Sequence, residues 1–201
     1  MKIKNVALLA LSVFALAACG GEPARKEATE QEFASAAAAA VEKGNPYKTA
    51  TMTAFYQLTQ NGQKTIDETD MKCTYTWGET GWNATDDKLG SYTHMYVNAP
   101  DTMIAPQITN VMNTLIKTTG ITDSSVKYYV EGGLGAKLTG KIDASMVARG
   151  ATGSLDMTVD FSFNDNGFIT KYENLNKGTF TYNNTNYNYE DHCGFTITYA
   201  A

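Results

Sequence analysis

Apolar and polar residues alternate along most of the chain from Tyr47 onward, and this two-residue period predicts β-strands. The alternation is strongest over 155–163, where a large apolar residue occupies every second position. Turn-forming pairs such as Asn61-Gly62 separate the segments and favour hairpins. From the candidate segments we expect about eight antiparallel strands. These nine segments are 47–58, 70–77, 92–97, 126–131, 136–146, 155–163, 168–175, 179–189 and 193–199.

Two segments instead carry the period of an α-helix. Thr29 and Glu32 form a capping-box pattern, which predicts a helix that runs to Lys43 and ends at Gly44. A second, central helix is predicted by a single apolar stripe at helical spacing, with Asp101 as a candidate cap and Gly120 after its end. The stripe consists of Ile104, Ile108, Val111, Met112 and Leu115.

These elements predict an α+β fold. Strict alternation gives each strand one buried face and one solvent-exposed face, as in antiparallel sheets. A strongly curved, half-barrel-like sheet wrapped around the central helix would give every apolar stripe a partner. We therefore expect residues 29–201 to form a single globular domain with an N-terminal and a central helix.

The first 18 residues have the pattern of a secretory signal. Lys2 and Lys4 precede an apolar run over 6–18, which is shorter than the roughly 20 residues that span a bilayer. The run ends in Leu16-Ala17-Ala18-Cys19, which resembles the lipobox of bacterial lipoprotein precursors. The resemblance implies that residues 1–18 are removed and that the Cys19 thiol carries a diacylglycerol anchor. The alternatives are a buried cysteine in an N-terminal helix and an uncleaved anchor.

Charge and composition agree with a body held beside a membrane by lipid alone. Residues 19–28 are rich in glycine and charge, which predicts a flexible tether. The whole chain has a net charge of -5, and loss of Lys2 and Lys4 with the leader makes the remainder more acidic. An acidic body disfavours nucleic acid as a partner. The expected location is extracytoplasmic, on the cell membrane or outer membrane.

The order of elements, together with the lipobox, is similar to the half-barrel envelope lipoproteins, including Lol-type lipoprotein carriers and related lipid-carrier lipoproteins. This resemblance implies a non-enzymatic protein that holds a lipid, another apolar ligand or a partner segment between sheet and helix. Methionine-rich surfaces adapt to varied apolar guests. The candidate ligand face is Met52, Met71, Met112, Met146, Met157, Phe161 and Phe163. The alternative is that these residues simply fill the core.

Cys73 and Cys193 remain if Cys19 is acylated, and both fall on apolar strand faces. A disulfide between them can persist outside the cytoplasm. Two separate buried thiols are the other interpretation, because cysteine is among the most buried residue types.

Other candidate chemistry is weak. The segment Tyr189-Glu190-Asp191-His192-Cys193 is rich in reactive groups, but neighbouring strand residues point to opposite faces, so His192 cannot activate Cys193. His94 and His192 lack zinc-type spacing, and the Asn164–Gly167 run is better explained by a hairpin than by a calcium loop. We therefore expect no metal, no cofactor and no catalytic residues.

A surface adhesin or glycan-binding module is the alternative function. Trp82, Tyr182, Tyr187 and Tyr189 lie near asparagine side chains, and flat aromatic faces beside amides suit sugar surfaces. Such residues are also common in ordinary outer strands and turns.

Overall fold

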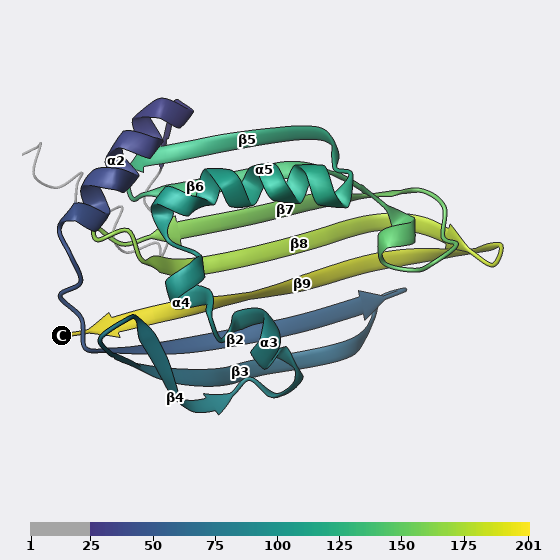
Figure 1. The fold of residues 1–201 in the computed structure, drawn as a ribbon. Helices are drawn as coiled ribbons and strands as arrows, with labels where there is room; N and C mark the ends of the chain where they lie inside the picture. Colours follow the sequence, from purple (N-terminus) through teal and green to yellow (C-terminus); the bar gives the residue numbers. More distant parts are fainter. Residues whose placement is uncertain (1–24) are drawn as a thin grey trace, which may run out of the picture.

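The computed structural model describes residues 25–201 and contains one nine-stranded antiparallel sheet (Figure 1). The strand order is β1-β5-β6-β7-β8-β9-β2-β3-β4, so the sheet is open, with β1 and β4 at its edges. The predicted α+β class with a curved, half-barrel-like sheet is confirmed, with nine strands where about eight were expected. The strands are β1 (Lys26–Ala28), β2 (Thr49–Gln60), β3 (Gln63–Trp77), β4 (Trp82–Lys88), β5 (Thr122–Glu131), β6 (Gly135–Asp143), β7 (Ser154–Phe163), β8 (Ile169–Tyr182) and β9 (Thr185–Ala200).

Helical elements lie on one face of this sheet (Figure 1). The two long helices are α2 (Glu30–Glu42), near β5, and α5 (Ile108–Thr119), which lies along β6 and β7. The remaining helical elements are short: η1 (Gly90–Tyr92), α3 (Thr93–Tyr96), α4 (Ala99–Thr102), η2 (Ala105–Gln107) and η3 (Ala144–Met146). Within residues 25–201, none of the helices is long and apolar enough to cross a membrane.

The predicted N-terminal helix and its cap are confirmed. The Thr29 hydroxyl accepts a hydrogen bond from the backbone N–H of Glu32, and the Glu32 carboxylate accepts one from the backbone N–H of Thr29. The helix buries Phe33, Ala37 and Ala40, and the Phe33 ring lies 5.1 Å from that of Tyr128 on β5. The methyl-rich face therefore lets the helix lie close against the sheet.

The central helix is also confirmed over Ile108–Thr119, but its predicted start and cap are wrong, because Ile104 lies before η2 and outside the helix. Gly120 ends α5 in the left-handed conformation, with φ of 62°. Asp101 does not cap this helix: its carboxylate accepts the backbone N–H of Trp82 instead, at 3.1 Å. It therefore holds the start of β4 rather than the start of α5.

The prediction of a strand over 92–97 is wrong, because this segment is helical and belongs to η1 and α3. The strand in this region is β4, which the alternation rule missed. Of its residues only Trp82 is buried, because β4 is an edge strand with solvent beside it. A polar edge strand leaves no two-residue apolar pattern to detect.

Two further boundaries differ from expectation. The last three residues of the predicted tether, Lys26–Ala28, form β1 and pair with β5, so the ordered body begins before residue 29. The segments 168–175, 179–189 and 193–199 form two long strands, β8 and β9, joined at Asn183-Asn184 with positive φ at both residues. The Tyr189–Cys193 segment consequently lies inside β9.

Candidate ligand cavity

The structure places six of the seven residues of the predicted ligand face in the packed core. Met52, Met71, Met112, Met157, Phe161 and Phe163 are all at most 9% exposed. Met146 is different, because it is 57% exposed. The strand ends at Asp143, whose carboxylate accepts the backbone N–H of Ser145 and starts the turn η3 that carries Met146 to the surface. Most of the interior between helix and sheet is therefore filled.

One cavity remains between α5, η3 and the sheet. Its volume is about 180 Å³, and its floor is formed by β6, β7 and β8. Met146 and Met157 are the members of the predicted face that line it. The full lining is Leu115, Thr119, Ile142, Met146, Met157, Val159, Tyr172, Asn174 and Asn176.

The roof of the cavity is the less buried part of α5. Ile108 and Met112, in the first half of the helix, are fully buried, whereas Leu115 and Ile116 are only half-buried. A second, open hollow of about 450 Å³ lies along the helix and shares Leu115 with the cavity. Leu115 is therefore the residue that lines both spaces.

The wall on β8 is polar. Asn174 and Asn176 line the cavity, and Asn176 is 7% exposed. The Asn174 amide nitrogen donates to Cys193 Sγ at 3.9 Å. The Oδ1 atoms of both asparagines are buried and have no hydrogen-bond partner among residues 25–201. The cavity thus has apolar walls from α5, η3, β6 and β7 and a polar wall from β8.

A carboxyl group lies on β9, next to the polar wall that β8 forms. Asp191 on β9 is the cross-strand partner of Asn176. Burial raises the pKa of Asp191 above its usual value, and hydrogen bonds from Asn176 and Tyr189 offset part of that rise. One of its oxygens, Oδ1, is also buried without a partner in the described chain. This part of the concave face therefore has an excess of hydrogen-bond acceptors.

The two described cysteines are free, buried thiols, which corresponds to the second of the two interpretations that the sequence left open. They lie on the two strands that flank β2, where Cys73 is opposite Met52 and Cys193 is opposite Tyr56. Met52 and Tyr56 are four residues apart on β2, so the two cysteines are offset by about 13 Å along the strand direction alone. A disulfide needs Cα atoms within about 7 Å of each other. The sequence could not reveal this offset, because it depends on the strand order.

This geometry predicts the result of a thiol titration. Unfolding the protein without reductant and adding Ellman's reagent should report two thiols, from Cys73 and Cys193, and none from an acylated Cys19. In the native protein the reaction should be slow, because burial raises the pKa of both thiols and the thiolate is the reactive form. Finding no thiol after unfolding would contradict the assigned register.

His192 and Cys193 lie on opposite faces of β9, as the alternation predicted. Cys193 faces the core, whereas His192 Nε2 lies 2.6 Å from Glu173 Oε1 on the other face, with the Phe55 ring at 4.8 Å. The Asn164–Gly167 segment forms the predicted hairpin turn, in which Asn164 Oδ1 accepts the backbone N–H groups of Asn166 and Phe168. Both groups of residues therefore have structural partners.

Two residues of the glycan-binding alternative, Trp82 and Tyr187, pack against other aromatic rings. Trp82 is 7% exposed, and its ring lies 5.2 Å from that of Trp77 and 5.4 Å from that of Tyr199. Tyr187 stacks on Phe180 at 5.5 Å. These rings pack on one another and leave no free flat face at Trp82.

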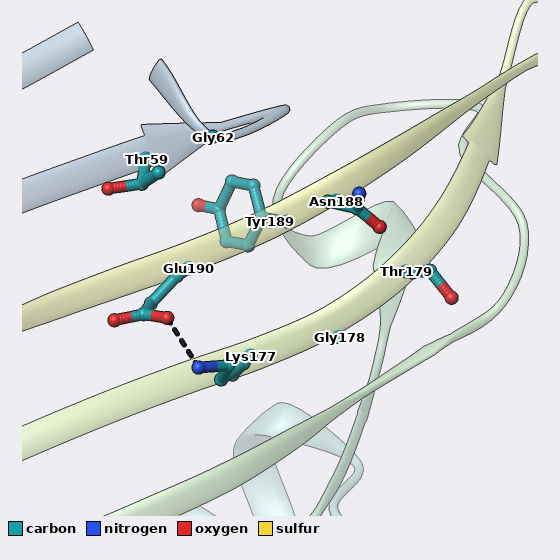
Figure 2. A pocket seen from close by; sticks show the side chains of 8 residues that line it. All are labelled: Thr59, Gly62, Lys177, Gly178, Thr179, Asn188, Tyr189 and Glu190. Carbon is teal, nitrogen blue, oxygen red and sulfur yellow. Dashed lines mark ion pairs between the residues drawn. The ribbon is translucent and has the colours of Figure 1, made fainter. Parts of the chain in front are cut away.

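A further groove of about 400 Å³ lies near the β2–β3 hairpin and crosses β8 and β9 (Figure 2). Lys177 and Glu190 face each other there and form an ion pair at 2.7 Å. Their charges offset one another, and the rest of the lining combines polar side chains such as Asn188 and Thr179 with Tyr189 and two glycines.

The comparisons with known proteins leave the function open. No protein-family model matches the sequence, and no curated protein matches it. Among the solved structures that show some similarity are two mycobacterial lipoproteins. LprF from Mycobacterium bovis is 8% identical, with a TM-score of 0.26 over 90% of this chain and 96% of that one. The Mycobacterium tuberculosis lipoprotein LppX is 12% identical, with a TM-score of 0.25 over 85% and 95%. TM-scores this low do not indicate a shared function.

Proposed function

We propose that this chain is a lipid-anchored, extracytoplasmic lipoprotein that binds an apolar ligand on the concave face of its sheet and performs no catalysis. The anchor would be Cys19, which lies outside the described residues together with the leader 1–18. The domain beginning at β1 would be the ligand-binding body. The lipobox supports the anchor, and the cavity under α5 supports the binding role.

The single observation that carries the binding role is the cavity lined by Met146 and Met157. Met146 is highly exposed for a methionine, and it lies at the mouth of an apolar space next to the half-buried Leu115. Flexible thioether side chains adjust to guests of varied shape. The exposed apolar surface of this methionine is unfavourable in water, and a bound apolar group would cover it and so gain free energy.

The size of the cavity limits what it holds as it stands. A water molecule takes about 30 Å³ in the liquid, so 180 Å³ corresponds to roughly six groups of that size. A short chain, or one end of a longer chain, fits this space. A longer guest would extend past Leu115 into the open hollow along α5.

Native mass spectrometry of the protein purified from membranes in detergent tests this proposal. We expect a bound apolar molecule, seen as mass beyond the chain and its acyl groups. Leu115→Trp should remove that extra mass, because the indole would occupy the cavity from the roof.

Lys117→Trp is the matched control, because Lys117 is an exposed residue of the same helix and lines neither space. It should retain the bound molecule. Absence of any bound molecule, together with no binding of apolar dyes, would reject the ligand-binding role.

A further inference from the structure

We propose that the ligand of this cavity carries a hydrogen-bond donor, a hydroxyl or an amine, on the end that meets β8, and not a carboxylate or phosphate. This inference deepens the proposed function and rests on it. The wall formed by Asn174 and Asn176 is the polar end of an otherwise apolar space, so it determines which polar group the ligand presents there.

The orientation of Asn176 follows from its neighbour Asp191. A carboxylate accepts hydrogen bonds and donates none, so the amide nitrogen of Asn176 is the atom that faces it. Its Oδ1 is then left without a partner in the described chain, although only 7% of the residue is exposed. A buried acceptor without a donor is unfavourable, and a ligand that supplies the donor removes that cost.

The surrounding groups favour the same choice. Asn174 Oδ1 is a second acceptor without a partner among residues 25–201, on the same strand and the same wall. The Thr119 hydroxyl at the roof already donates to the backbone carbonyl of Leu115, at 2.6 Å. Tyr172 carries the other hydroxyl group of the lining. The lining therefore offers one available hydroxyl donor, while two amide oxygens lack a hydrogen-bond partner in the described chain.

An anionic group would be disfavoured here for a second reason. Asp191 lies behind Asn176 with one oxygen unpaired in the described chain, and lysines of β8 such as Lys177 are on the other face of the sheet in ion pairs. A carboxylate or phosphate would be brought near a like charge without a cation to balance it. A hydroxyl or an ammonium meets acceptors instead.

Nuclear magnetic resonance on the full chain, purified in detergent and labelled at its methionine methyl groups, tests this inference. Met146 and Met157 line the cavity and report binding there, while Met52 is buried outside the lining and serves as an internal control. The probes are hexan-1-ol, hexylamine, hexanoate and 1-methoxypentane, an isomer of hexanol that lacks a donor. Titration of the Met146 and Met157 signals gives a Kd for each probe.

We expect hexanol and hexylamine to bind about tenfold more tightly than the ether and hexanoate, which is the effect of satisfying one buried acceptor. Asn176→Leu should abolish this preference while the ether still binds. Asn188→Leu, at an exposed asparagine of β9, should keep it.

The alternative outcomes are distinct. Equal affinities for hexanol and its ether isomer, or tightest binding of hexanoate, would overturn this inference and leave apolar binding intact. If none of the probes shifts Met146 or Met157, the proposed function fails and this inference fails with it. The wild-type series decides the question even if the Asn176 variant does not fold.

Discussion

Replacement of Cys19 by serine is expected to abolish incorporation of labelled fatty acid into this protein. Only a thiolate is nucleophilic enough to take the diacylglycerol as a thioether, and a serine hydroxyl at the same position is not. Two acyl chains make a stable anchor, since each buried methylene contributes about 0.8 kcal/mol. Metabolic labelling with radioactive palmitate, followed by electrophoresis, measures the effect directly, and the expected loss is complete.

The other cysteines provide matched controls for this experiment. Cys73→Ser and Cys193→Ser remove thiols that are buried in strands β3 and β9. Both variants should be labelled as strongly as the wild type. Failure of the wild-type chain to take up label would refute the lipoprotein assignment and, with it, the proposed location.

Replacement of Phe195 by alanine is expected to lower the free energy of unfolding by about 3 to 5 kcal/mol, the usual range for a buried phenylalanine. Phe195 is fully buried on β9, and its ring lies 5.4 Å from that of Tyr96 and 5.5 Å from that of Tyr172. The ring joins α3 to the middle of the sheet, so its loss leaves a cavity that these neighbours cannot all fill. Urea unfolding followed by tryptophan fluorescence measures the change.

Phe55 is the matched control, because it neighbours this position on the opposite face of the sheet. Phe55 on β2 pairs with Gly194 on β9, and the next pair along these strands is Ala54 with Phe195. The two rings therefore lie at neighbouring positions but on opposite faces of the sheet. Phe55 is half-buried against His192. Phe55→Ala should cost about 1 kcal/mol or less. Similar decreases in the free energy of unfolding for both variants would mean that the core does not lie on the face of the sheet that the helices cover.

The filled interior bears on the proposed binding role. Six residues predicted to form a ligand face are in the core, and the cavity uses Met157 from that group, together with the exposed Met146. Binding therefore depends on the second half of α5, where Leu115 and Ile116 are only half-buried. A segment with few fully buried apolar residues opens at lower free energy than the rest of the fold.

The pattern along the chain predicted those parts of the fold whose signals are local. Thr29 and Glu32 marked the start of α2, and Gly120 marked the end of α5. The unbroken alternation over 155–163 predicted β7, whose core-facing residues are buried as expected. These signals succeed because a cap, a turn or a half-buried strand is specified by residues within a few positions of each other.

The signals failed where burial depended on distant partners. β4 carries almost no apolar alternation because it is an edge strand, so the pattern predicts no strand over Trp82–Lys88 and predicts one over 92–97 instead. The spacing of Met146 continues that of Ile142 and Ala144 and therefore predicts a strand face for it. The Asp143 side chain ends the strand and turns Met146 outward.

The sequence by itself determined the class of fold, the two main helices and which face of each long strand is apolar, because these follow from periodicity and capping. Only the tertiary structure decided that β2 separates Cys73 from Cys193, that most of the methionines are packed, and that Asn174 and Asn176 stand beside a cavity. All three depend on contacts between elements that are far apart in the chain, such as β2 and β9, where Met52 pairs with Ile197.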